Sequence, residues 1–492
     1  MWSTGATSSA SSSCPSTRRG GCASPRRPRP RKRALPTRRR PAPAGKVHRD
    51  RTHRPAGGEE YLATRLGNGA RVLTETMRGV RSVAVGAWIR QGSALESAEM
   101  MGASHLLEHM VFRGTENRSR QEIALALESL GGSLNAYTSR EHTGYEARVL
   151  ADHLPQAAEV ISDLVRNPLL AESDLEREKE VVGEEIAQVE DTPDDLVFEL
   201  HGDRMWRGHP YGHSILGTRD TVGALTCEDL TALHRTSYVG ANLVVAAAGC
   251  VEHDAFVDLA REWFGDIGAG CEAPAVADPG KVRPGTDRVA RESAQTHIVL
   301  GRDTPGHAHD DRYALILLSA ALGGGMSSRL FQRVREELAL AYSVYAFQSF
   351  YARAGVLGIY VGTRPAWAPA ALDAVREVCR DVASEGLPPD ELARIKEQVK
   401  GQLMLSLEAP GARLHRLAGF ALHGEPFAGL DEVQGMIDGV SGCDIVRVAG
   451  EVLDPERLYA LCLGPSSPWT ESPRHSTGDA SGLAASHHLS TL

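Results

Sequence analysis

The run His105-Leu-Leu-Glu-His109 places two histidines and a glutamate at the spacing of a metal site with its own base. On a helix, residues at i and i+4 lie one turn apart on the same face, so His105 and His109 can bind one ion. Glu108 faces the same spot and can act as general base on a metal-bound water, and imidazole suits zinc. The run therefore predicts zinc-dependent hydrolysis. The alternative is an amphipathic helix with two partly buried histidines and a solvated glutamate.

A catalytic zinc site uses three protein ligands and leaves the fourth position for water. The acidic segment 174–190 can supply the third ligand, because it consists of helix formers apart from Gly183. In helical phase, Glu178 and Glu185 share an otherwise apolar stripe, whereas Glu184 falls on a polar side. A carboxylate on an apolar face needs a partner, which a metal ion supplies. We expect Glu185 to bind zinc and Glu178 to support a ligand histidine. A plain charged surface helix is the alternative.

Several further motifs lie in the order of a known family. They are Phe112-Arg-Gly-Thr115, Gly131-Gly-Ser-Leu-Asn-Ala-Tyr-Thr138 continuing to Tyr145, His209-Pro-Tyr-Gly212 with Ile215-Leu-Gly217, and Ser328-Arg-Leu-Phe331 continuing to Tyr342. With His-x-x-Glu-His, then 75 intervening residues, then a glutamate in an E-x6-E helix, the chain resembles the pitrilysin family of inverted zincins. This family includes insulin-degrading enzyme and mitochondrial processing peptidase. The resemblance covers about residues 60 to 465 and is closest to the two-domain bacterial and processing-peptidase branch.

The resemblance implies a zinc metalloendopeptidase that cleaves extended peptides or unfolded segments, with one Zn²⁺ per chain. Arg335 and Tyr342 match an Arg/Tyr pair that, in the family, reaches from the second half to substrate carbonyls near the zinc. A guanidinium and a phenol can stabilise a tetrahedral oxyanion, so both are candidate catalytic residues. Without the resemblance, an ordinary helix with a surface arginine and a buried tyrosine would be the better interpretation.

The segment 134–138 is expected to be an edge strand that pairs with substrate through backbone hydrogen bonds. Its candidate substrate-binding residues are Asn135, Ala136, Tyr137 and Thr138. In the family, two such chains, or four domains in one long chain, enclose a chamber, so a dimer is implied. A homodimer suffices because the metal motif and the Arg/Tyr pair are both present, and a heterodimer with a non-catalytic sister chain is the alternative. A second possible function is a non-catalytic structural or assembly subunit, although such relatives usually lose their metal ligands.

An internal repeat indicates two related halves. Segment 174–186 aligns with 391–403 at an offset of 217, which Pro193 and Pro410 keep. At this offset Glu185 becomes Gln402, so the second half should hold no equivalent metal. We expect an α+β fold with two homologous sheet-plus-helices domains, half of a clamshell chamber. The predicted parts are a disordered basic tail (1–57), a catalytic domain (58–270), a linker (271–284), a second domain (285–465) and a disordered tail (466–492).

Charge is distributed unevenly along the 492 residues, whose formal net charge is −9. Residues 1–57 hold 15 Lys and Arg against one acid, Asp50, which leaves 39 basic and 62 acidic residues of the 54 and 63 in the chain. The acidic body argues against nucleic acid as a partner. No apolar run is long enough to span a membrane. Eight scattered cysteines without C-x-x-C suit a reducing compartment. We expect a cytoplasmic protein, or an organelle-matrix protein if the Arg/Ser-rich N-terminus is a transit segment.

Overall fold

The computed structural model describes residues 48–53, 60–465 and 467–469, all of which belong to one unit, residues 43–492. Most of the two predicted tails, 1–57 and 466–492, lies outside the described residues. The exception in the first tail is 48–53, which forms a strand, β1, instead of continuing a disordered segment. The strand exists because its backbone pairs with the next strand, a contact that composition does not reveal. Among the described residues, no helix is both long and apolar enough to cross a membrane.

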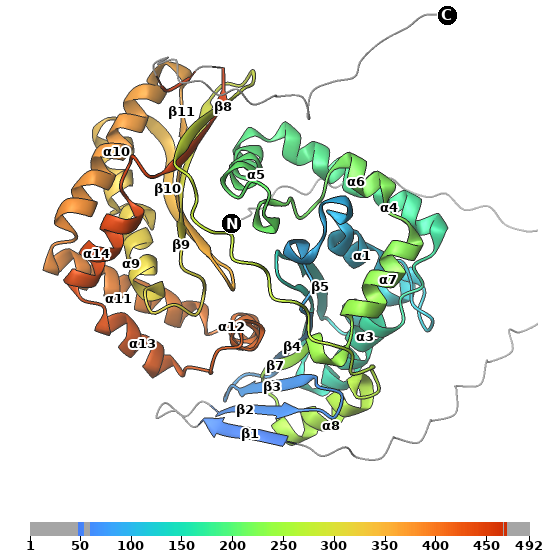
Figure 1. Cartoon of the computed structure of the whole chain (residues 1–492). Coiled ribbons are helices and arrows are strands. Elements are labelled where there is room, and N and C mark those ends of the chain that lie inside the picture. The colour runs from blue at the N-terminus through green and yellow to red at the C-terminus, as the bar shows by residue number, and fades with distance from the viewer. Residues whose placement is uncertain (1–47, 54–59, 466, 470–492) are drawn as a thin grey trace, which may run out of the picture. The chain divides into compact units, whose positions relative to one another are not determined.

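The first half of the chain is built on a seven-stranded sheet with the order β1-β2-β3-β7-β4-β6-β5 (Figure 1). Its strands are β1 (His48–His53), β2 (Glu60–Arg65), β3 (Arg71–Thr76), β4 (Ser82–Ile89), β5 (Ser133–Thr138), β6 (Thr143–Leu150) and β7 (Leu243–Gly249). Only the β3–β7 pair is parallel. Strands β4 and β7 are buried along nearly their whole length, as expected where both faces of a sheet are covered. Strand β5 lies at the edge.

Helices of the first half follow the sequence expectation for a sheet with covering helices. They are α1 (Ala103–Val111), α2 (Arg120–Glu128), α3 (Leu154–Arg166), α4 (Glu172–Asp191), α5 (Pro193–Met205), α6 (Arg219–Ala224), α7 (Cys227–Ser237) and α8 (His253–Phe264), with 3-10 turns at Ser93–Leu95, Ala98–Met100, Ala151–His153, Pro210–Gly212 and Gly240–Asn242. Helix α1 contacts both α4 and the edge strand β5. This packing brings the His-x-x-Glu-His run next to the acidic helix.

A five-stranded sheet, in the order β10-β11-β9-β12-β8, forms the second half. Its strands are β8 (Gly285–Ala290), β9 (Thr296–Thr304), β10 (Ala341–Phe350), β11 (Gly355–Thr363) and β12 (Tyr459–Gly464). The order repeats β5-β6-β4-β7-β3 of the first sheet, and its parallel pair, β8–β12, stands where β3–β7 stands. The predicted fold class, with two homologous sheet-plus-helices domains, is confirmed.

The second half carries α9 (Arg312–Gly323), a π-helix (Phe331–Glu337), a 3-10 turn (Pro365–Trp367), α10 (Ala368–Glu385), α11 (Pro389–Ser406), α12 (Pro410–His423), α13 (Leu430–Gly439) and α14 (Gly442–Val452). In chain order α9 stands where α1 stands in the first half, and like α1 it contacts the edge strand, here β10, and the helix that aligns with α4, here α11. A Cβ added to Gly323, the last residue of α9, would lie 2.0 Å from the amide nitrogen of Ala346 on β10. The glycine run therefore lets a strand backbone pack directly on the helix end.

The two halves exchange one helix each. Helix α12 of the second half packs on β3, β4 and β7 of the first sheet, and α5 of the first half packs on β9 and β12 of the second. These are equivalent helices, because each begins with the proline that marks the 217-residue offset. A buried ion pair fixes α12 in place: a guanidinium nitrogen of Arg413 lies 2.7 Å from a carboxylate oxygen of Glu75 on β3. Side chains of both halves consequently share one hydrophobic core.

Candidate metal centre and active site

Helix α1 presents its polar residues on one face because its apolar residues are fully buried. Leu106, Leu107, Met110 and Val111 are all buried, whereas His105, Glu108 and His109 are partly exposed. The carboxylate of Glu96 accepts hydrogen bonds from the amides of Gly102 and Ser104, at 2.9 and 2.6 Å, and so satisfies the start of the helix. The rigid, buried side of the helix thereby fixes the direction of the three polar side chains.

His105, His109 and Glu185 converge on one point. One ligand atom of each lies within 4.8 Å of the others, and this is the one such group of three found among the described residues. The Nε2 atoms of His105 and His109 each lie 3.7 Å from an oxygen of Glu185. Such a separation is too long for a hydrogen bond, yet it is close to the roughly 3.4 Å between two ligands of a tetrahedral zinc ion with bonds of about 2.05 Å. The residues present therefore fit a zinc ion.

Unsatisfied atoms at the same point support this fit. The oxygen of Glu185 that faces His105 is buried and accepts no hydrogen bond. Burial, followed by the nearness of His109, lowers the pKa of His105 to about 4, so this imidazole is neutral near pH 7. A neutral imidazole with a free lone pair opposite a carboxylate is the donor set that zinc prefers.

Glu178 lies behind the metal ligands rather than among them. Its side chain is almost fully buried, and one carboxylate oxygen lies 3.1 Å from Nδ1 of His109. An Nδ1–H that donates to this carboxylate leaves the Nε2 lone pair free to face Glu185. The other oxygen of Glu178 pairs with the guanidinium of Arg113, one helical turn after His109. The pairing with Arg113 balances a buried charge, and nothing in the sequence singled it out beyond its place in the Phe-Arg-Gly-Thr motif.

Glu108 is held by a hydroxyl rather than by solvent. The Oγ1 of Thr138, the last residue of β5, donates a hydrogen bond of 2.7 Å to one carboxylate oxygen of Glu108. Burial raises the pKa of Glu108, and the hydrogen bond from Thr138 acts in the opposite direction. A base whose pKa lies above the ordinary carboxyl value accepts a proton more readily near neutral pH. Sequence reasoning placed Thr138 near the substrate and missed this contact.

A cleft opens between α1 and β5. Asn135 and Ala136 line it together with Glu108, His109, Phe112 and Arg113. The side chain of Tyr137 points elsewhere: its hydroxyl accepts a hydrogen bond of 2.9 Å from Nε1 of Trp88 on β4. Strand β5 pairs with β6 on one side, and no other described strand pairs with its outer edge. Of the four candidate substrate-binding residues, two thus line the cleft and Thr138 holds Glu108.

Arg335 and Tyr342 contact each other but do not line this cleft. The guanidinium carbon of Arg335 lies 4.7 Å from the ring centre of Tyr342, and the tyrosine side chain is 76% exposed. Tyr342 stands at the start of β10, whose other end, at Phe350, leads into the turn that contacts the first half. Eight residues of strand span about 27 Å. Tyr342 thus lies about the length of a strand from the turn that contacts the first half, and the role of the pair near a zinc site stays a prediction.

Two family models match the chain. Residues 71–219 match insulinase (peptidase family M16), and residues 224–399 match the peptidase M16 inactive domain. An uncharacterised zinc protease of Streptomyces coelicolor is 40% identical over 413 residues, which cover 82% of this chain and 89% of the relative. Another, of Mycobacterium leprae, is 37% identical over 84% of this chain and 93% of the relative. A third, of Bacillus subtilis, is 38% identical over 78% of this chain and 92% of the relative.

Solved structures show the same fold. A protease from Helicobacter pylori superposes with a TM-score of 0.76 at 23% identity, covering 83% of this chain and all of the other. A peptidase M16 inactive domain from Pseudomonas fluorescens superposes with a TM-score of 0.77 at 20% identity, covering 83% of this chain and 98% of the other. At these identities the likeness concerns the fold alone.

Proposed function

Because this chain belongs to peptidase family M16, as its resemblance indicated, we propose that it is a zinc metalloendopeptidase that cleaves extended peptides or unfolded segments. One observation carries the proposal: two imidazole nitrogens and a carboxylate converge at zinc-ligand separations beside a second carboxylate, Glu108. His105, His109 and Glu185 would hold one Zn²⁺ per chain. The bound ion would supply Lewis-acid chemistry, activating a water and polarising the scissile carbonyl.

Side chains of this chain would carry out the proton transfers and hold the reacting groups and the substrate in place. Glu108 accepts the proton of the attacking water and returns it to the leaving amine nitrogen. Thr138 keeps the carboxylate of Glu108 in place for both transfers. Glu178 fixes the orientation of His109. The outer edge of β5 pairs with the substrate backbone, which selects for extended chains more than for a particular sequence.

The test is cleavage of an unstructured, internally quenched fluorescent peptide by the purified full chain. We expect cleavage that a zinc chelator stops and that added Zn²⁺ restores, with about one zinc bound per chain. Cleavage that survives complete removal of the metal would contradict the proposal. A chain that binds no zinc and cleaves nothing would favour the alternative, a non-catalytic assembly subunit.

We further propose that two chains form the working enzyme, with a homodimer sufficient. Tyr342 is exposed and Arg335 is half-buried, and two apolar residues close to them in sequence, Met326 and Leu338, are also exposed, at 76% and 39%. Such a patch marks a surface that another molecule covers. Since the pair does not line the cleft of its own chain, the zinc site that it completes would belong to the second copy.

Mixing two inactive variants tests this arrangement. Glu108→Gln lacks the base, and Tyr342→Phe lacks the phenol, so each homodimer should be nearly inactive. In a mixed dimer one of the two sites has Glu108 from one chain and Tyr342 from the other. After exchange of equal amounts about half of the dimers are mixed, so about a quarter of the normal activity should return. If Tyr342 acts within its own chain, mixing restores nothing, because each intact residue then stands in a different site. Mass measurement of the mixture shows whether mixed dimers formed.

A further inference from the structure

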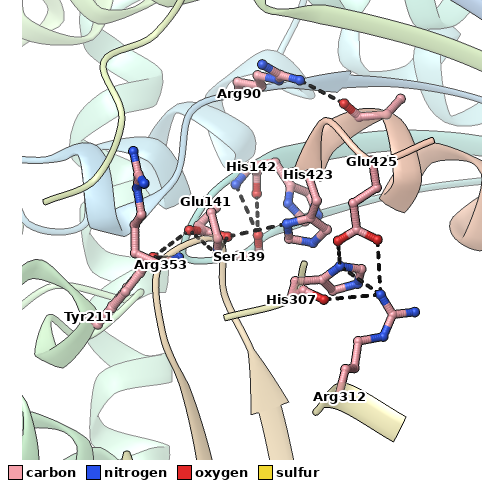
Figure 2. A network of polar contacts seen from close by, with 12 residues as sticks. Arg90, Ser139, Glu141, His142, Tyr211, His307, Arg312, Arg353, His423 and Glu425 are labelled. Atoms are coloured by element: carbon pink, nitrogen blue, oxygen red, sulfur yellow. Dashed lines mark hydrogen bonds and ion pairs between the residues drawn. The ribbon is translucent and has the colours of Figure 1, made fainter. Parts of the chain in front are cut away.

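The turn between β5 and β6, Ser139 to His142, directly follows Thr138, whose hydroxyl holds Glu108. Figure 2 shows Ser139, Glu141 and His142 of this turn. The turn is closed by its own hydrogen bonds: the amide and the hydroxyl of Ser139 both donate to the carbonyl of His142 at 2.8 Å. A shift of this turn is therefore transmitted along the backbone to Thr138 as a unit. Whatever fixes the turn also fixes the hydrogen bond between Thr138 and Glu108.

Glu141 joins this turn to the second half of the chain. Its carboxylate accepts the amide hydrogen of Ala352, with both oxygens at 3.0 Å from the nitrogen. Ala352 belongs to the turn between β10 and β11. The imidazole of His423, at the end of α12, lies 4.0 Å from the same carboxylate. Two contacts from the second half thus converge on one side chain of the zinc-bearing half.

Tyr211, a residue of the first half, contacts both Glu141 and the β10–β11 turn. Its ring is fully buried, its hydroxyl donates a hydrogen bond of 2.8 Å to Glu141, and the same oxygen accepts one of 3.2 Å from the amide of Arg353. The ring also stacks on Tyr351, with centres 4.6 Å apart. Figure 2 shows Glu141 between Tyr211 and His423, with Arg353 beside it. Only 15% of the Glu141 side chain is exposed. A buried carboxylate with this many partners fixes the positions of the groups around it and does not contribute to solubility.

We propose that Glu141 is a positioning residue for peptide hydrolysis: by joining the β5–β6 turn to the β10–β11 turn, it holds Thr138 against Glu108. This inference rests on the proposed function, because it assigns Glu108 the role of base. It would give the half without metal ligands a part in the chemistry of the other half. Strand β10 carries Tyr342 near its start, and at its end it leads into the turn whose Ala352 amide donates a hydrogen bond to Glu141.

The test is a double-mutant cycle on full-length protein with the quenched peptide. Glu141→Ala should lower kcat about 10- to 100-fold and leave KM within about twofold, because small displacements of a catalytic group are costly. In the Thr138→Val background, the same change should alter kcat by less than about twofold, since its route to Glu108 is already cut. In the Thr138→Ser background, which keeps the hydroxyl, the full effect should remain. Glu141→Gln, which retains one acceptor, should recover part of the loss.

Glu146→Gln is the matched control. Glu146 on β6 also pairs with the second half, through Nε2 of His415 at 2.8 Å, but it lies outside the turn. It should keep kcat within about twofold of the wild type. Bound zinc and melting temperature show whether each variant folds, and Tyr211→Phe, which removes a single oxygen, replaces Glu141→Ala if that variant does not.

The outcomes separate the two proposals. Additive effects of Glu141→Ala and Thr138→Val, or an unchanged kcat in Glu141→Ala, would overturn the positioning role while the peptidase stands. If the wild type shows no chelator-sensitive cleavage, the proposed function fails and this inference falls with it.

Discussion

Replacing Glu108 by glutamine should leave a protein that binds zinc normally and cleaves peptides roughly 10²- to 10⁴-fold more slowly, the usual contribution of a positioned general base. Glutamine has the size of glutamate and can still accept the hydrogen bond of Thr138, so the fold and the cleft should persist. It cannot take up a proton at neutral pH. The loss should therefore appear in kcat, with KM little changed.

The measurement is kcat for the quenched peptide together with zinc content per chain. A variant that retains full activity with zinc bound would show that another group takes the proton. Loss of both zinc and activity would show that Glu108 has a structural role at the metal, which its geometry does not indicate, because its carboxylate faces Thr138.

The second large effect is expected at Glu185, and its neighbour Glu184 supplies the control. Glu185→Gln should weaken zinc binding more than about a hundredfold, because loss of a mere supporting partner already costs roughly 10- to 100-fold. Activity at limiting zinc should fall accordingly, and excess zinc should restore part of it. Glu184→Gln makes the same change of charge one residue away, on the exposed side of α4.

Competition with a chromogenic zinc chelator measures both affinities under one condition. We expect Glu184→Gln to match the wild type within about twofold. Equal weakening in the two variants would mean that the general negative charge of α4 attracts the ion. Weakening in Glu184→Gln alone would exchange the two roles and refute the assignment from helical phase.

Periodicity placed the parts of the site that lie on helices. The i, i+4 spacing of His105 and His109 needs only a helix to bring two imidazoles together, and α1 is that helix. The same reasoning favoured Glu185 over Glu184, and in the structure Glu185 faces the histidines while Glu184 is exposed. Pro193 and Pro410, which are 217 residues apart, also indicated equivalent helices, and each begins one. These features are local in sequence, which is why one sequence sufficed to find them.

Contacts between distant segments could not be found in this way. Thr138 donates to Glu108 across 30 residues, and Glu141 accepts from Ala352 across 211. No spacing rule links such pairs, because they depend on how a sheet edge meets a helix and how two turns meet. The position of Tyr342 is another example. The resemblance predicted a contact with substrate, but only the structure shows that Tyr342 does not line the cleft of its own chain and stands at the start of β10.

Because α5 and α12 are exchanged, each half supplies a helix that packs on the sheet of the other half. A gene duplication alone would have left two self-sufficient modules, either of which a later deletion could remove. Because α12 of the second half covers the first sheet, a deletion of the second half would expose the sheet of the half that carries His105, His109 and Glu185. The second half can therefore lack equivalent metal ligands and still contribute to the stability of the first.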